Sequence, residues 1–494
     1  MSFFAPQHPN TDLKKQSLRG GAVTLTSQSL SLVIHLGSTM ILARILSPQD
    51  YGIIAMVAAI TGFAGVFSDL GLSTATIQRD KISHEQVSNL FWINAGLGLI
   101  ITLVVASLSP AVAWFYHTPQ LVWVTVVLSM NFMITGLGVQ HQALLTRQMR
   151  FFSLAKIHIF SMLLGIGIAI LMALHGYRYW ALVFNTITLS ASNTFCLWLV
   201  ARWQPCLPKH KTGIRPMIRF GSDIAGFNTI NFFARNLDNI LIGRYHGSGP
   251  LGFYSKAYQL LMMPITNFRA PLDKVALPAM SRLQNDHERF RDYYMEYLSI
   301  LSFIYMPLVT FMFVCSDNII KIILGPQWIK AGEIFRILAI AALIQPVGSS
   351  RGLVLLSTGQ SRKYLFQGVT VALIISLAIV LGVSKGAKGV AWAYAISVYA
   401  VLFPSLFFSY KNTSIHIGHF LEAIKQPFAA SLAMGVICYL LLSKIRIFGD
   451  MASLVICLIT GILSYLGLII FFSRGLKNLL KYYEYSKLMF KNIH

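Results

Sequence analysis

The stretch PMIRFGSDIAGFNTINFFARNLDNILIGRY, residues Pro216 to Tyr245, combines the length and apolarity of a bilayer-spanning helix with many polar side chains. Asn228, Asn231, Arg235 and Asp238 are spaced three or four residues apart, so they share one face of a helix. A charged side chain in hydrocarbon costs about 2.5–3.5 kcal/mol on insertion scales, so this face must meet protein or water. Two interpretations remain open: a structural ion pair that neutralises itself, or a hydrated cavity, which the asparagines favour.

The whole chain has the composition of a polytopic membrane protein. Of its 494 residues 55% are hydrophobic and only 12% are charged, and the mean hydropathy is +0.63. The net charge of +23 does not indicate a nucleic-acid partner, because the basic residues lie in short loops between apolar runs and suit anionic lipid. The five cysteines show no CxxC spacing, so we expect neither a disulfide framework nor a metal site. No cofactor is expected.

Apolar runs predict an all-α protein with about fourteen transmembrane helices and an internal repeat. Arg44 and Gly52 match Arg244 and Gly252 at a separation of 200 residues, and later matches keep similar offsets. Two six-helix halves in the same orientation are therefore expected, followed by two additional helices. The predicted parts are an N-terminal tail (1–21), a six-helix bundle (22–203), a basic linker (204–215), a second six-helix bundle (216–410), two additional helices (411–473) and a basic tail (474–494).

Basic residues also predict the orientation. With both termini in the cytoplasm, and with residues near segment ends counted with the adjoining loops, 26 of the 40 Lys and Arg residues lie on the cytoplasmic side, nine lie on the opposite side, and five lie deeper within segments. This bias follows the positive-inside rule, and an even number of spans agrees with it.

The five basic residues within segments suggest a cationic cavity. Besides Arg235, they are Lys256 and Arg269 in the eighth segment, and Arg336 and Arg351 in the tenth, which is predicted as one helix over Ile329–Leu356. Lys256 and Arg336 lie near the outer interface, where their heads can also snorkel to water. A cationic cavity suits an anionic headgroup, because arginine offers phosphate a bidentate fork of hydrogen-bond donors.

Two further polar residues at membrane depth keep structural and functional interpretations open. His35 in the first helix can be a packing residue or a proton site. Asp69, near the cytoplasmic end of the second segment, can pair with a cavity base, bind a cation or take up a proton.

Two common catalytic motifs are absent from the sequence: it has no H-E-x-x-H and no G-x-x-x-x-G-K-[ST] pattern. The outer loops are too short for an extramembrane catalytic domain. We therefore expect a protein that is not an enzyme.

Three stretches resemble the bacterial polysaccharide-transporter family, which belongs to the superfamily of multidrug, oligosaccharidyl-lipid and polysaccharide exporters. They are LARILSPQDYGIIAMV (Leu42 to Val57), FSDLGLSTATIQRD (Phe67 to Asp80) and FGSDIAGFNTINFFARNLDNILIGRYHGSGPLGFYSKAYQL (Phe220 to Leu260). The resemblance implies two six-helix bundles in a V around a cationic central cavity. It also implies a bacterial inner-membrane location and undecaprenyl-diphosphate-linked oligosaccharide as cargo for O-antigen, capsule or exopolysaccharide assembly. Polymerase and chain-length components of that assembly are possible partners.

We therefore predict a flippase for lipid-linked oligosaccharide repeat units. Arg235 and Arg351 are predicted to bind the diphosphate, with the other substrate-binding residues being Asn228, Asn231, Asp238, Arg269 and Lys256. One alternative is a cation-coupled multidrug exporter, which would need an anionic cavity. Another is a membrane-embedded repeat-unit polymerase, which would need a large outer loop.

Overall fold

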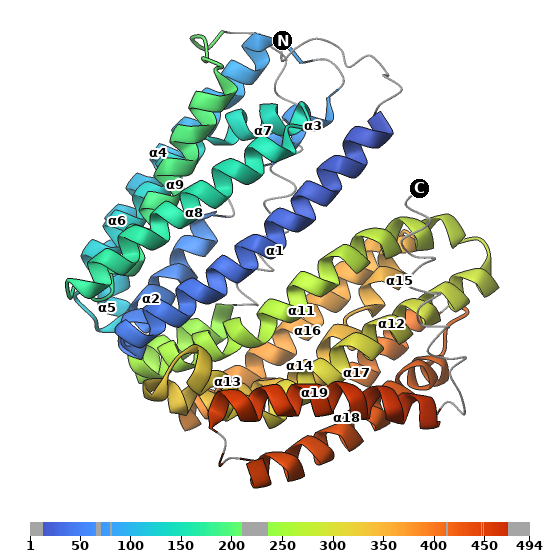
Figure 1. Cartoon of the computed structure of the whole chain (residues 1–494). Helices are drawn as coiled ribbons and strands as arrows, with labels where there is room; N and C mark the ends of the chain where they lie inside the picture. Colours follow the sequence, from blue (N-terminus) through green and yellow to red (C-terminus); the bar gives the residue numbers. More distant parts are fainter. Residues whose placement is uncertain are drawn as a thin grey trace. The chain divides into compact units, whose positions relative to one another are not determined.

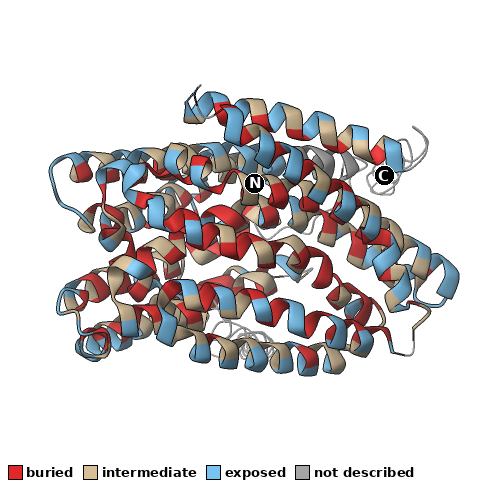
Figure 2. Cartoon of the chain, turned by 90° about the horizontal axis from the view of Figure 1, so that it is seen from below, coloured by how far each residue is buried: buried red, intermediate tan, exposed pale blue. Residues whose placement is uncertain are grey.

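The computed structural model describes residues 13–65, 71–79, 82–209, 236–411, 413–445, 447 and 449–472. Within these ranges the chain consists of helices joined by short turns, with no strand (Figure 1). The predicted all-α class is confirmed. Most helices carry buried residues along one side and exposed residues along the other (Figure 2).

The chain forms two compact units, Met1–Gly252 and Phe253–His494. The helices of the first unit are α1 (Leu13–Ile45), α2 (Pro48–Gly65), α3 (Leu72–Gln78), α4 (His84–Ser107), α5 (Ser109–Tyr116), α6 (Leu121–Gly136), α7 (Val139–Arg147), α8 (Phe151–Leu174) and α9 (Trp180–Ala201). Residues 236–246 are also helical and belong to this unit.

The long helix α11 (Ser248–Leu283) begins at the end of the first unit and continues into the second. The remaining helices are α12 (His287–Val314), α13 (Ser316–Ile323), α14 (Ile329–Gly348), α15 (Arg351–Ser357), α16 (Ser361–Gly382), α17 (Gly386–Tyr410), α18 (Ile417–Ile445) and α19 (Asp450–Phe472). Short 3-10 turns, η1 (Pro326–Trp328) and η2 (Val383–Lys385), precede α14 and α17.

The same order of helices occurs in both units. In the first, α4 is followed by the eight-residue α5, the interrupted pair α6 and α7, and the long α8 and α9; in the second, α12 to α17 repeat this order. The packing also repeats, because α4 contacts α6 as α12 contacts α14, and α8 contacts α9 as α16 contacts α17. Figure 1 shows α8 beside α9. The internal repeat seen in the sequence is therefore a structural repeat.

Local sequence signals explain where helices begin. Ser83 and Gln86 form a reciprocal capping box at the start of α4. The Asp286 side chain accepts a hydrogen bond from the backbone N–H of Arg289 at the start of α12. These caps fix the residues at which the two repeat-related helices α4 and α12 begin.

Two of the predicted segments are interrupted rather than continuous: the fourth, Leu121–Leu145, divides into α6 and α7, and the tenth divides into α14 and α15. The tenth, expected as one helix over Ile329–Leu356, ends as α14 at Gly348 and restarts as α15 at Arg351. Pro346 lies just before the interruption and lacks the N–H that would continue the helix. The prediction of one continuous helix was wrong here because serines at 349 and 350 can satisfy the backbone carbonyls of the tighter turn.

Ten stretches of the described chain are long and apolar enough to cross a membrane. They account for eleven of the fourteen predicted segments, because α16 and α17 form one continuous stretch, Ser361–Tyr410. The other three are the second segment (Ile53–Ile77), the seventh (Pro216–Tyr245) and the eighth (Gly252–Leu277). The seventh lies mostly outside the described residues, and the eighth corresponds to the proline-containing and polar α11. A multi-pass membrane protein is thus shown, and the count of fourteen stays a prediction.

The basic linker predicted over residues 204–215 begins with a segment, residues 206–209, that is held against α4 and is called the strap here. The Asn89 side chain donates to the carbonyl of Lys209 at 2.7 Å and accepts from its N–H at 2.9 Å. Ser88 and Trp92 lie one turn apart on the same helix. The Ser88 hydroxyl accepts from the N–H of Cys206, and the Trp92 indole N–H donates to the carbonyl of Cys206. Residues 206–209 are therefore held by side chains that satisfy their backbone groups. The predicted domain boundaries themselves stay predictions.

Candidate functional site

The helix α11 carries an exposed polar face. Thr266, Asn267 and Lys274 are exposed on it, and the side chains of Arg269 and Asp273 keep 23% and 34% of their surface exposed. Polar and charged groups in such numbers do not face lipid, so this side of α11 meets water or a polar ligand.

Prolines shape this part of α11. Pro264, Pro271 and Pro278 follow each other at intervals of seven residues, and Pro271 lies midway between Arg269 and Asp273. A proline inside a helix removes one backbone hydrogen bond and allows the helix to bend. The carbonyl of Ile265 gains an additional partner, because the buried Tyr305 on α12 donates to it at 2.8 Å. This contact fastens α11 to α12 one turn before Arg269.

Arg269 is the first cation of the site. Its Nε donates to Asp273 Oδ2 at 3.0 Å, and its Nη1 donates to the hydroxyl of Ser349. The second oxygen of Asp273 accepts from the hydroxyl of Tyr297, a fully buried residue of α12. The Arg269 guanidinium is thus held between α11 and the interruption of the α14–α15 segment.

Arg351 is the second cation, and it stands where that interruption ends. Its Nη1 donates to the carbonyl of Gly348 at 2.6 Å. The adjacent Ser350 hydroxyl lies 2.9 Å from the hydroxyl of Tyr294, which also lies 2.9 Å from that of Tyr410 on α17. Both arginines interact electrostatically with Tyr294. Consecutive serines therefore bring the two guanidinium groups into one polar network.

The two arginines keep donors for a ligand. Among the described residues, Arg351 Nε is buried and has no hydrogen-bond partner. Leaving a buried charged donor unpaired is costly, so an anion that accepts from it would be stabilised. Among the described contacts, Arg269 uses only Nε and Nη1. The two guanidinium groups can therefore bind a polyanion from two sides. This network is referred to as the arginine site, and its residues are Arg269, Asp273, Tyr294, Tyr297, Ser349, Ser350, Arg351 and Tyr410.

The remaining predicted site residues have different positions. Asn228, Asn231, Arg235 and Asp69 lie outside the described residues. Asp238 is buried in the first unit, where its Oδ1 accepts from the N–H of Asn239 at 2.8 Å. Asp238 is thus the one residue of the predicted polar face of the seventh segment that the structure describes, and it is buried.

Lys256 and His35 are not shown to belong to the arginine site. Lys256 is 9% exposed and donates to Gln259 Oε1 at 2.9 Å, so the alternative that it snorkels to water was wrong. It precedes Arg269 by thirteen residues, about 20 Å along an ideal helix. His35 is half-buried in α1. Arg336, the other residue expected to snorkel, is paired with Asp317 at 2.5 Å.

Several residues of the arginine site were missed by sequence reasoning: Asp273, Tyr294, Tyr297, Ser349, Ser350 and Tyr410. One signal was available, because Arg269 and Asp273 have the i, i+4 spacing of a helical ion pair. The tyrosines and serines carry no such signal, since each contributes only through partners distant in sequence.

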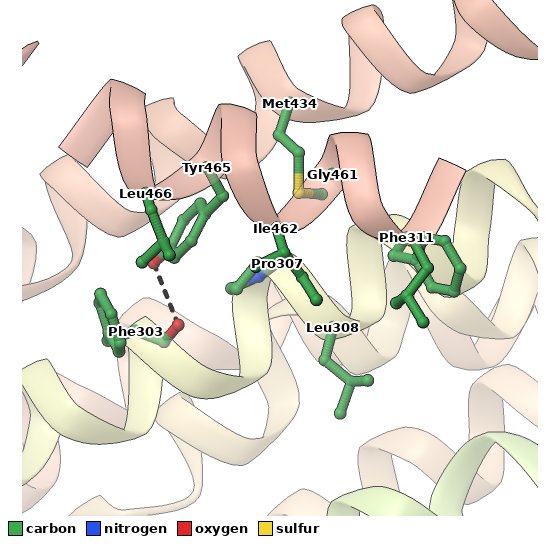
Figure 3. Close-up of a pocket in the computed structure, with 10 residues that line it drawn as sticks. Phe303, Pro307, Leu308, Phe311, Met434, Gly461, Ile462, Tyr465 and Leu466 are labelled. Carbon is green, nitrogen blue, oxygen red and sulfur yellow. Dashed lines mark hydrogen bonds between the residues drawn. The ribbon is translucent and has the colours of Figure 1, made fainter. Parts of the chain in front are cut away.

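A separate cavity of about 300 Å³ lies between α12, α18 and α19 (Figure 3). Its lining is apolar, including Phe303, Pro307, Phe311, Met434 and Leu466. The polar group of Tyr465 is already satisfied, because its hydroxyl donates to the carbonyl of Phe303 at 3.0 Å. This cavity suits an apolar chain and offers nothing to an anion.

Comparison with known proteins identifies the family and the fold. A family model described as polysaccharide biosynthesis protein matches residues 41–333. The teichuronic acid biosynthesis protein TuaB of Bacillus subtilis is 28% identical, with 86% of this chain and 89% of TuaB covered. The lipopolysaccharide biosynthesis protein WzxC of Escherichia coli is 25% identical, covering 87% and 88%. The succinoglycan biosynthesis transport protein ExoT of Rhizobium meliloti is 23% identical, covering 81% and 82%.

Two solved transporters share the fold. The lipid II flippase MurJ in an inward closed conformation superposes with a TM-score of 0.74 at 15% identity, covering 92% of this chain and 99% of MurJ. An inward-facing multidrug resistance transporter of the MATE family gives a TM-score of 0.61 at 13% identity, covering 79% and 96%. The chain therefore belongs to the polysaccharide biosynthesis protein family and has the fold of a multi-pass membrane transporter.

Proposed function

We propose that this protein is a flippase that moves undecaprenyl-diphosphate-linked oligosaccharide repeat units from the cytoplasmic to the periplasmic leaflet. Family membership supports this function, as do relatives whose names assign them to lipopolysaccharide, teichuronic acid and succinoglycan biosynthesis. A fold shared with a lipid II flippase supports it independently. The oligosaccharide passes through a hydrated path, and the polyprenyl chain stays in hydrocarbon.

The observation that carries the proposal is the arginine site. Arg269 and Arg351 come from different helices, lie beside consecutive serines and retain hydrogen-bond donors, one of which is buried without a partner. A diphosphate offers several acceptor oxygens and two negative charges, so it can bridge both guanidinium groups. A single phosphate has fewer acceptor oxygens to share between the two guanidinium groups.

The polar face of the seventh segment would complete the path. Arg235 is proposed to bind the diphosphate of the cargo, and Asn228, Asn231 and Asp238 to contact sugar hydroxyls or bound water. Lys256 is proposed as a further contact on α11, although its ammonium group already donates to Gln259. Asp69 is proposed to hold a cavity base rather than to couple ions, so Asp69→Asn should lower the folded yield.

The proposed location is the bacterial inner membrane, with both termini in the cytoplasm. The charge bias of the loops supports this orientation. Such a flippase would deliver its cargo to the polymerase and chain-length components that act in the periplasm.

The proposal is tested by complementing a flippase-null strain with Ala, Lys and Glu variants of Arg269 and Arg351 at matched protein levels. Removing one partner of a buried charge pair costs about 2–5 kcal/mol, which corresponds to roughly thirtyfold to several thousandfold in affinity. Lysine should restore export only in part, because a point charge does not reproduce the guanidinium fork. Arg336→Ala is the matched control, since Arg336 pairs with Asp317 outside the arginine site.

The readout is exported polysaccharide together with the lipid-linked sugar that accumulates in the inner leaflet. The Glu variants should abolish export and cause accumulation, whereas Arg336→Ala should export normally. Normal export by both Arg269→Glu and Arg351→Glu would exclude the arginine site as the diphosphate site.

A further inference from the structure

The Asp273 carboxylate occupies the place where an anionic ligand of Arg269 would bind. It accepts from Arg269 Nε at 3.0 Å, and both side chains are partly exposed, so a ligand can reach them. Tyr297 fixes the carboxylate from the other side, because its buried hydroxyl donates to the second oxygen. Asp273 is therefore a fixed internal anion rather than a mobile surface charge.

The charges of the arginine site define which ligands can displace Asp273. Arg269 and Arg351 contribute two positive charges and Asp273 contributes one negative charge, so the described network has one positive charge in excess. A phosphodiester headgroup of a bilayer lipid carries a single negative charge. If such a headgroup displaced Asp273, Arg269 would exchange a contact with one carboxylate for a contact with one phosphate. The free headgroup would be at a disadvantage, because Asp273 is attached to the chain and is always close to Arg269.

A diphosphate diester carries two negative charges and is long enough to place acceptors on more than one cation. It can accept from the donors that Asp273 leaves unused, including the buried and unpaired Nε of Arg351. Such a ligand gains contacts that a single phosphate does not reach. The competition with Asp273 therefore favours diphosphate over monophosphate.

We propose that Asp273 is a specificity-determining residue that excludes single-charge phospholipid headgroups from Arg269, the cation that it occupies in the arginine site. This inference rests on the proposed function, because it takes the diphosphate as the natural ligand. A cationic site in a membrane is surrounded by phosphodiester lipids, and an internal anion prevents these lipids from occupying it. Ser349 assists by holding the guanidinium of Arg269 beside the interruption that carries Arg351.

The experiment compares two soluble probes on the purified full-length protein in nanodiscs of zwitterionic phosphatidylcholine. One probe is a short-chain prenyl-diphospho-N-acetylglucosamine, and the other is the matching prenyl-phospho-N-acetylglucosamine. Equilibrium dialysis gives both dissociation constants, and their ratio measures the selectivity. The wild type should prefer the diphosphate by at least about tenfold.

Asp273→Asn keeps the shape of the side chain and removes its charge. We expect it to bind the monophosphate about tenfold more tightly and to lose most of the selectivity, because a competing anion no longer occupies Arg269. Phosphatidylglycerol added to the nanodiscs should then inhibit diphosphate binding by this variant and not by the wild type. Asp273→Glu should retain selectivity.

Asp317→Asn is the matched control, because it removes an aspartate that pairs with an arginine in the same unit but outside the site. Tyr297→Phe provides a second test that keeps every charge, and it should reduce the selectivity by a smaller factor. An unchanged ratio in both Asp273→Asn and Tyr297→Phe would overturn the role of Asp273. A wild type that binds neither probe would instead overturn the proposed function.

Discussion

The backbone contact between the two repeat-related motifs, around Gly52 and Gly252, provides a test of the fold. Gly52 near the start of α2 faces the Ser248 carbonyl at the start of α11, and Gly252 faces the Pro48 carbonyl. A Cβ at position 52 would lie 1.7 Å from the Ser248 carbonyl oxygen, and one at position 252 would lie 1.8 Å from the Pro48 carbonyl oxygen. The two backbones therefore touch reciprocally, at residues that the internal repeat relates by 200 positions.

Gly52→Ala should destabilise the protein strongly. Cβ atoms essentially never approach other heavy atoms within 3.0 Å, so the contact must open from 1.7 Å to at least that separation. The opposing atom is backbone, and a rotamer change cannot relieve the clash. Overpacking typically costs about 1–3 kcal/mol, and we expect the upper end of that range because two helix starts must separate.

The assay is folded yield and thermal midpoint of detergent-solubilised protein, followed by size-exclusion chromatography of a fluorescent fusion. Gly249→Ala is the matched control in the same turn, since its Cβ would meet only Gln49 at 3.7 Å. Gly52→Ala combined with Gly252→Ala should cost less than the sum of the single changes, because the first substitution already opens the contact that the second needs. Equal midpoints for Gly52→Ala and Gly249→Ala would refute the backbone contact.

Three further predictions concern the linker and the topology. Asn89→Ala should release the strap and speed proteolysis after Lys209, measured on inverted membrane vesicles, because two backbone groups lose their partner at once. The Glu85 carboxylate raises the pKa of Lys209 above its ordinary value of 10.5. The ion pair therefore stabilises the strap fully below pH 10.5, and protection from proteolysis should fall as the pH rises through the raised pKa of Lys209. A cleavage rate that does not depend on pH would contradict this role of the ion pair. In a cysteine-free background, a cysteine at Lys211 should resist an impermeant thiol reagent in intact cells and one at Ser248 should react; the reverse pattern would overturn the topology.

The sequence alone determined the class of the protein. Apolar runs of bilayer length must form helices, since hydrocarbon leaves backbone groups no other partners, and the excess of basic residues on one side predicts the orientation. The repeat was visible because Arg44 and Gly52 recur as Arg244 and Gly252 within short motifs. These signals are local, so they need no knowledge of which helices pack together.

The composition of the arginine site was decided only by the tertiary structure. Arg269 and Arg351 were each recognisable as charges at membrane depth, but their connection runs through Ser349 and through tyrosines of α12 and α17. The burial of Lys256 was equally hidden, because its place near the predicted interface allowed the ammonium group to reach water. Hydropathy reports how much apolar surface a helix carries, whereas the partner of a polar group depends on which faces of distant helices meet.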